Sequence, residues 1–205
     1  MKDFGLIVIG AHFGVWLKDE ITKYKNKNIL LVEPVPYNYK ILKEEYKNFE
    51  NIIICTNAII DKNETKNFFF VKEKSIHSLG KHWASGIGSF DKQHILNHRT
   101  KRFKVSDEDI EIKEIEFITF DTLIKNYGVK SIEKLQIDVE GAEYKILNSI
   151  DLSNIDIKEI FFEFKHFDGT FKEGPKLLEI KDKLISSGYE INNFDDENII
   201  AKKII

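Results

Sequence analysis

The sequence is poor in cysteine: its 205 residues include one, Cys55, so an internal disulfide is excluded. Cys55 lies in an apolar run, which is typical of a small buried hydrophobic residue. So little cysteine fits a reducing compartment, and we expect a cytoplasmic protein. Proline and glycine form no linker-like stretch, and the chain has no internal repeats. Residues 1–205 are therefore predicted to form a single domain.

An excess of one charge is also lacking, because 31 basic and 34 acidic residues leave a net charge of −3. This balance offers no basic surface, and we predict neither nucleic acid nor a membrane as a partner. Gly10 and His12 cut the apolar run near the start, which is too short for a signal or membrane-spanning segment. The hydrophobic fraction of 42% is that of a globular protein with a sizeable core.

Strands and helices are predicted to alternate along most of the chain. Apolar runs indicate buried strands at residues 6–9, 29–32, 52–56, 135–139 and 159–164. Helical spacing indicates helices at residues 15–24, 37–46, 120–127, from 142, and 175–187. Residues 189–194 and 198–202 are predicted to form an antiparallel pair. The alternation favours an α/β fold with a mostly parallel sheet, interrupted by an insertion at about residues 61–116.

Residues 134–147, KLQIDVEGAEYKIL, place three carboxylates at a strand-to-helix turn. Ligands of open α/β sheets bind outside the carboxyl ends of the strands, so Asp138 is predicted to be functional. Glu140 and Glu143 have two interpretations. They face the same ligand, or they are first-turn acids that complement the helix dipole.

A second candidate site is the turn that starts at Gly10 and ends at Gly14. Glycines there allow a ligand to approach the backbone, although they also serve a tight turn alone. The dinucleotide pattern G-x-G-x-x-G fails, because His12 takes the second glycine position. Glu33 follows the second strand and is placed to accept the hydroxyls of a ribose, or is a surface glutamate before Pro34.

The motifs G-A-H-F-G-V-W, L-V-E-P, T-N-A-I, I-D-V-E-G-A-E and F-F-E-F together resemble the FkbM-type methyltransferases. The resemblance spans about residues 6–164, and the I-D-V-E-G-A-E block is its most specific part. It implies a doubly wound, mostly parallel, seven-stranded sheet, with the insertion between the third and fourth core strands. It also implies S-adenosylmethionine as the cofactor and methyl transfer to oxygen.

The resemblance also implies roles for particular residues. The first turn lines the methionine part of the cofactor, Glu33 holds the ribose, and Asn57 and Ala58 flank the adenine. The predicted cofactor-binding residues are Gly10, Ala11, His12, Gly14, Glu33, Pro34, Asn57, Ala58 and Asp138. The sequence departs from the family at Val8, usually aspartate, and at His12, usually asparagine. The cofactor's amino group then lacks one partner, for which Asp138, Glu140 and backbone carbonyls are candidates.

Methyl transfer to a hydroxyl needs a group that takes the proton, and the predicted catalytic residues are Asp138, Glu140 and His166. His166 follows the fifth predicted core strand, and its alternative role is that of a solvated loop histidine. Asp138, Glu140 and Glu163 are oxygen donors that suit a hard cation, but they show no fixed ligand spacing. We therefore predict no metal. The histidines at 77, 82, 94 and 98 do not match a zinc pattern either.

Residues 83–90 are predicted to be a loop that closes over the acceptor. Aromatic residues offer faces for a sugar ring or adenine, and glycine and serine offer mobility and hydrogen bonds. The predicted substrate-binding residues are Trp83, Ser85, Gly86, Ser89 and Phe90. The alternative is an ordinary turn between packed elements.

The sequence thus predicts an O-methyltransferase that acts on a hydroxyl of a sugar, a glycan or a related small molecule. The alternative is a nucleotide-binding Rossmann-like module without methyl transfer. A nucleic-acid methyltransferase is a third and weaker interpretation. It requires a basic track and an N-P-P-Y-like tetrad, and the sequence has neither.

Overall fold

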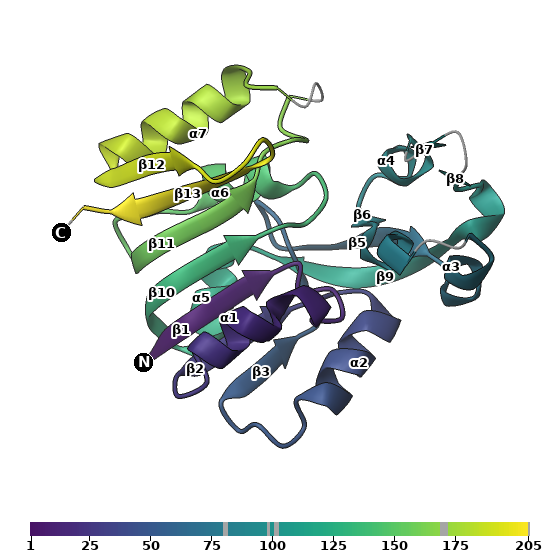
Figure 1. Ribbon diagram of the computed structural model, residues 1–205, viewed down its shortest axis with the longest axis horizontal. Coiled ribbons are helices and arrows are strands. Elements are labelled where there is room, and N and C mark those ends of the chain that lie inside the picture. The colour runs from purple at the N-terminus through teal and green to yellow at the C-terminus, as the bar shows by residue number, and fades with distance from the viewer. Residues whose placement is uncertain (80–81, 98, 101–102, 169–171, 205) are drawn as a thin grey trace.

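The computed structural model describes residues 1–79, 82–97, 99–100, 103–168 and 172–204; the side chains at 82, 83, 99, 100 and 103 are not described. One sheet has the strand order β12-β13-β11-β10-β1-β2-β3 (Figure 1). Its strands are β1 (Lys2–Ile9), β2 (Asn28–Val32), β3 (Ile52–Cys55), β10 (Val129–Ile137), β11 (Asp156–Glu163), β12 (Tyr189–Asn193) and β13 (Asn198–Lys203). β13 runs opposite to the other strands of this sheet, which are parallel to one another, so the predicted mostly parallel, seven-stranded α/β fold is confirmed.

Helices cover both faces of this sheet (Figure 1). They are α1 (Lys18–Lys23), α2 (Pro36–Glu45), α5 (Phe120–Tyr127), α6 (Glu143–Ser149) and α7 (Pro175–Ser186). Successive strand residues point to opposite faces. In β1, Leu6 and Val8 pack in one buried cluster with residues of α1 and α2. Ile7 and Ile9 pack in the other cluster, with residues of α5, α6 and α7.

The first predicted helix, at residues 15–24, is divided in two. A 3₁₀ turn, η1 (Val15–Leu17), precedes α1, and Gly14 before it is left-handed with φ of 79°. A tight turn after a left-handed residue makes i→i+3 hydrogen bonds before an α-helix begins. The buried side chains of Leu17 and Ile21 still lie four residues apart, so one apolar face continues across both pieces.

A second, four-stranded sheet lies between β3 and α5 in the chain, in the order β4-β9-β5-β6. Its strands are β4 (Ala58–Ile59), β5 (Glu64–Val71), β6 (Gly88–Ser89) and β9 (Ile110–Ile118). The other elements of this region are α3 (Glu73–Leu79), η2 (His82–Gly86), α4 (Lys92–Asn97), β7 (Arg99–Thr100), β8 (Phe103–Lys104) and η3 (Asp107–Asp109). Figure 1 shows this region projecting beside the ends of β1 and β10.

Aromatic packing joins the two sheets. Phe68, Phe70 and Phe117 form a buried cluster with Val35 and Tyr37, which come from the start of α2. The Tyr37 hydroxyl donates to the carbonyl oxygen of Val71 at 2.8 Å. The second sheet is therefore fixed against the first by both apolar and polar contacts.

The expected loop at residues 83–90 is not an open loop. It consists of part of η2 and of β6, which pairs with β5. Ala84 and Ile87 are fully buried with Val71 and Ile95 in a local core. The glycine content indicated mobility, but the buried side chains of Ala84 and Ile87, on either side of Gly86, anchor the segment instead.

Cys55 is buried at the end of β3, as predicted. Among the described residues, no helix has both the length and the apolar character that crossing a membrane requires.

Candidate functional site

The chain reverses its direction across the sheet next to β1. It adds β2 and β3 on one side and later returns to β10 on the other. A crevice forms at the carboxyl ends of the strands at such a point. A cavity is found there, and we call it the switch-point cavity. The predicted residues that line it are Gly10, Ala11, His12, Glu33, Pro34, Asn57, Ala58, Gly86, Ser89, Phe90, Asp138 and Glu140.

Gly10 explains how the ends of β1 and β10 come together. The backbone N–H of Asp138 donates to the carbonyl oxygen of Ile9 at 2.9 Å. Gly10 has φ of +90°, and a Cβ there would lie 1.7 Å from the carbonyl oxygen of Asp138. Only glycine combines that conformation with that approach. The first turn and the Asp138 turn therefore form one continuous wall of the cavity.

Glu33 is buried rather than a surface glutamate, with 4% of its surface exposed. Its Oε2 accepts the backbone N–H of His12 at 2.8 Å, and its Oε1 accepts that of Val35 at 2.9 Å. Asn38 donates its side-chain amide to Oε1 at 3.4 Å. Burial raises the pKa of Glu33 to about 7, although these hydrogen bonds act in the opposite direction. Each carboxylate oxygen has two acceptor positions, so Glu33 retains capacity for ligand hydroxyls.

Two predicted residues lie next to the switch-point cavity instead of lining it. Ser85 places its Oγ 2.5 Å from His12 Nε2, and its carbonyl oxygen accepts the Asn38 amide at 2.8 Å. Ser85 therefore positions His12. A Cβ on Gly14 would lie 2.8 Å from Leu42 of α2, so this glycine serves packing. The predicted Trp83 side chain lies outside the described residues.

Sequence reasoning missed much of the apolar lining. The unpredicted residues that line the cavity are Ile9, Trp16, Leu17, Val32, Val35, Ile59, Phe68, Gly88, Phe117, Gln136, Val139 and Ala142. Phe68 and Phe117 pack edge to face, with ring centroids 6.0 Å apart. They come from antiparallel strands far apart in the chain, so periodicity alone does not bring them to the cavity. Trp16 lies two residues after Gly14, the end of the glycine turn, and its position was an available signal.

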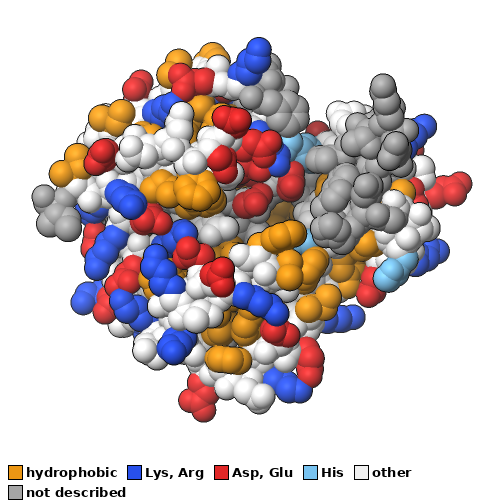
Figure 2. All heavy atoms as spheres, viewed as in Figure 1, with side chains coloured by type: hydrophobic (Ala, Val, Ile, Leu, Met, Phe, Trp, Pro, Cys, Tyr) orange, Lys and Arg blue, Asp and Glu red, His pale blue; other side chains and the backbone are white. Residues whose placement is uncertain are grey.

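Carboxylates gather on one side of the cavity. We call Asp138, Glu140, Glu143, Glu163 and His166 together the acidic crevice. Figure 2 shows Asp and Glu side chains around a hollow between the body of the molecule and the projecting region, with a histidine beside them. One oxygen from each of Asp138, Glu143 and Glu163 lies within 4.8 Å of the others. Glu163 ends β11 and was not among the predicted catalytic residues.

Burial, together with the crowding of like charges, shifts the protonation of these acids. Asp138 is open to the cavity, yet burial by the surrounding protein, with Glu140 next, raises its pKa to about 6. Burial and the neighbouring Asp138 raise the pKa of Glu163 to about 8. Burial raises the pKa of Glu143 to about 7. Each shift disfavours the charged form, so the crevice retains protons near neutral pH.

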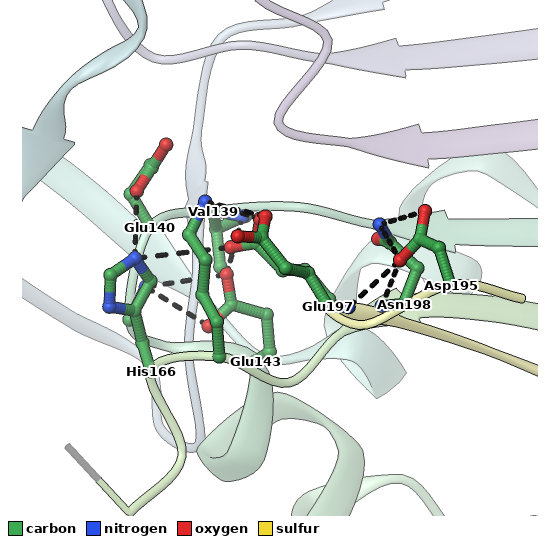
Figure 3. Close-up of polar contacts among 10 residues, drawn as sticks. Val139, Glu140, Glu143, His166, Asp195, Glu197 and Asn198 are labelled. Atoms are coloured by element: carbon green, nitrogen blue, oxygen red, sulfur yellow. Dashed lines mark hydrogen bonds and ion pairs between the residues drawn. The ribbon is translucent and has the colours of Figure 1, made fainter. Parts of the chain in front are cut away.

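Glu143 and Glu140 have different roles in the turn. Glu143 Oε1 accepts the Val139 N–H at 2.8 Å, and its Oε2 accepts the Gly141 N–H at 3.0 Å. Glu143 therefore closes the turn that follows Asp138. This role goes beyond that of a first-turn acid that complements the helix dipole. Glu140 is left-handed, with φ of 57°, and its Oε2 lies 3.1 Å from His166 Nε2. Figure 3 shows the Glu140 carboxylate and the His166 ring facing each other.

His166 is not a solvated loop histidine. Its side chain is 13% exposed, and its ring lies 5.2 Å from the ring of His94 between centroids. It does not line the switch-point cavity directly, but Glu140 does. The three predicted catalytic residues therefore meet in one crevice.

The family model for the methyltransferase FkbM domain matches residues 9–191. Among solved structures, the chain is similar to the methyltransferase FkbM of Methylobacillus flagellatus KT, with 12% identity and a TM-score of 0.55. That match covers 98% of this chain and 43% of the other. The chain is also similar to the Methanococcus jannaschii fibrillarin pre-rRNA processing protein, with 14% identity, a TM-score of 0.50, and coverage of 98% and 67%. No curated protein matches the sequence significantly.

The two structural similarities show the fold alone, because sequence identities this low do not carry a function from one protein to another. The chain spans less than half the length of the Methylobacillus protein. The family model covers most of the chain, and it agrees with the predicted cofactor, S-adenosylmethionine. The predicted family is therefore confirmed: the chain belongs to the FkbM methyltransferase family.

Proposed function

We propose that the chain transfers a methyl group from S-adenosylmethionine to a hydroxyl of a sugar, a glycan or a related small molecule. The observation that supports this most is that Glu33 and Asp138 line the same cavity. A buried carboxylate beside a glycine turn suits the ribose of a nucleoside cofactor. Asp138, a second carboxylate that follows β10, suits the acceptor.

The lining of the cavity fits the parts of this cofactor. Gly10, Ala11 and His12 line the cavity and would hold the methionine part. Asn57 and Ala58 line the same cavity and would flank the adenine, for which Phe68 and Phe117 offer apolar ring surface. Pro34 and the buried Glu33 lie between these two groups of residues in the chain.

When bound, S-adenosylmethionine supplies a methyl group that its sulfonium already activates. The acceptor oxygen bonds to the methyl carbon, the carbon–sulfur bond breaks with its electrons going to sulfur, and the hydroxyl proton leaves. The protein must hold the oxygen in line and take this proton. Asp138 and the Glu140–His166 pair are the two candidates for that proton, and both belong to the acidic crevice.

Several features favour a neutral, polyhydroxylated acceptor. Gly86, Ser89 and Phe90 line the cavity and offer a ring face and hydrogen bonds. Phosphate groups would be repelled by the carboxylates of the acidic crevice, which disfavours nucleic acid. The M. jannaschii protein is described as a pre-rRNA processing protein, but the net charge of −3 does not favour RNA binding by this chain.

Calorimetry with S-adenosylhomocysteine tests the cofactor, and a methyl-transfer screen on glycans and small polyols tests the acceptor. We expect binding in the micromolar range and transfer to at least one hydroxyl compound. The alternative, a nucleotide-binding module without methyl transfer, predicts binding without transfer. Absence of S-adenosylhomocysteine binding would reject the proposal.

A further inference from the structure

Three carboxylates meet in the acidic crevice, and the proposed transfer gives a role to only one of them, Asp138. Asp138 follows β10, Glu163 ends β11, and Glu143 begins α6. One oxygen of each lies within 4.8 Å of the other two. Three negative charges in that space repel each other strongly in a protein interior. The cluster must therefore hold protons or a positive charge.

Glu163 provides an independent indication that the cluster holds a positive charge. The residue is 6% exposed, and its Oε1 pairs with Lys165 Nζ at 2.5 Å. Its Oε2 is buried and accepts no hydrogen bond from any residue that the structure describes. The His166 Nε2 lies 4.0 Å away, beyond hydrogen-bonding distance. A buried acceptor without a donor is costly, and a cation would satisfy it.

We propose that Asp138, Glu143 and Glu163 bind one hard divalent cation, Mg²⁺ or Mn²⁺, and that this cation holds the acceptor hydroxyl. The second part rests on the proposed function; the first does not. Carboxylate oxygens select hard cations of this kind over softer ones. Glu163 would use Oε2 for the cation while Oε1 keeps Lys165. Asp138 is open to the cavity, so coordination positions remain for water or a substrate oxygen.

The cation would change the roles of the two candidate bases. A bound divalent ion lowers the pKa of an oxygen that it coordinates, so a hydroxyl on it loses its proton more easily. Asp138 would then be a cation ligand. His166, which Glu140 holds at 3.1 Å, would accept the proton. This assignment keeps all three predicted catalytic residues and gives Asp138 a different task from the Glu140–His166 pair.

Direct Mn²⁺ binding to the full chain tests the site without any methyl transfer. The protein is freed of metal with a chelator, and the free Mn²⁺ signal is followed by electron paramagnetic resonance during titration. We expect one Mn²⁺ per chain. Glu163→Gln and Asp138→Asn should each weaken the affinity by at least about tenfold, because each removes a ligand charge. Glu197→Gln is the matched control, because Glu197 lies 3.8 Å from Lys165 but outside the cluster.

Proton release gives a second measurement. The charged groups around the cluster are Asp138, Glu140, Glu143, Glu163, Lys165, His166 and Glu197. Cation binding requires ionised carboxylates, so Mn²⁺ should release protons and should bind more tightly as the pH rises. Mn²⁺ binding to Glu163→Gln should release fewer protons than Mn²⁺ binding to the wild type.

No Mn²⁺ binding at millimolar concentration would overturn the proposal, as would equal affinity in wild type, Glu163→Gln and Asp138→Asn. The cluster would then be held by shared protons. Thermal unfolding of each variant checks that it is folded. If Glu163→Gln does not fold, Asp138→Asn, at an open position, still tests the site. Titration of the same samples with S-adenosylhomocysteine separates the cation site from the proposed function. A protein that binds Mn²⁺ but not S-adenosylhomocysteine would reject the proposed function and leave the cation site standing.

Discussion

The backbone N–H of His12 donates to Oε2 of Glu33 at 2.8 Å, while His12 itself adopts a left-handed conformation with φ of 52°. This bond ties the first turn to the end of β2. Left-handed backbone is costly for a residue other than glycine, so a compensating contact is expected there. Glu33 thus has two tasks in our proposal: it shapes the turn and offers the remaining acceptor position of Oε2 to the ribose.

Glu33→Ala should weaken S-adenosylhomocysteine binding by roughly 1–3 kcal/mol, the scale for losing hydrogen bonds to a charged group. Calorimetry measures the change directly. Glu33→Gln is the control, because it keeps the shape and one acceptor oxygen and should lose less. Equal affinity in wild type and Glu33→Ala would remove Glu33 from the ribose site.

Gly10→Ala should destabilise the fold by at least about 3 kcal/mol, because the new Cβ meets the Asp138 carbonyl at 1.7 Å. Gly188→Ala is a matched control. Gly188 has a similar φ of +85° but has nothing within 4 Å of a new Cβ, so only the left-handed strain of about 1–2 kcal/mol applies. Urea unfolding gives both values. Similar costs at the two positions would contradict the close approach of the strand ends.

The ends of the parallel strands were the part of the site that the sequence could predict. Gly10, Glu33 and Asp138 each follow an apolar run, and in a parallel sheet such positions meet at one edge. The acidic crevice was less predictable, because Glu163 reaches it from β11 and Glu143 had the ordinary appearance of a first-turn acid. Asp138, Glu140 and Glu163 were recognisable in the sequence as oxygen donors, but without a fixed ligand spacing they predicted no metal, and Glu143 was not among them.

The second sheet was predictable only in outline. The sequence marked about residues 61–116 as an insertion, and the glycines at 86 and 88 suggested a mobile loop within it. Long-range packing decides the outcome, since Ile87 enters a local core that also contains Val71 and Ile95. The contact between His12 and Ser85 joins segments 73 residues apart, which no local pattern specifies.

The stability of the fold should fall as the pH rises from about 4.5 to about 8 when metal is absent. Burial raises the folded-state pKa to about 7 for Glu33 and Glu143, about 6 for Asp138 and about 8 for Glu163. In the unfolded chain the three glutamates ionise near pH 4.5 and Asp138 near pH 3.8, so the folded chain binds more protons within that window. A state that binds more protons loses stability as the pH increases.

Urea unfolding between about pH 5 and 8, with a chelator present, measures this dependence. Glu163→Gln cannot ionise and should show a smaller fall in unfolding free energy. Glu190→Gln, at an exposed position of β12, should behave like wild type. The same pH dependence in all three proteins would rule out Glu163 as a source of the effect.

Asp138→Asn and His166→Ala should each lower the methyl-transfer rate by about 10²–10⁴-fold, while S-adenosylhomocysteine affinity stays unchanged. The two variants should differ in their response to Mn²⁺. Excess Mn²⁺ should partly restore Asp138→Asn, because mass action refills a weakened cation site. It should not restore His166→Ala, in which the proton acceptor is missing. Rates with the hydroxyl acceptor found by the screen, measured across Mn²⁺ concentrations, distinguish the two.

Other results for Asp138→Asn would assign that residue differently. Loss of S-adenosylhomocysteine affinity together with rate would place the carboxylate on the cofactor's amino group, where Val8 leaves a partner missing. A lowered rate that Mn²⁺ does not change would make Asp138 the base and reject its role as a cation ligand. Full activity with unchanged binding of both ligands would leave Asp138 with a structural role, joined to Ile9 through its backbone N–H at 2.9 Å.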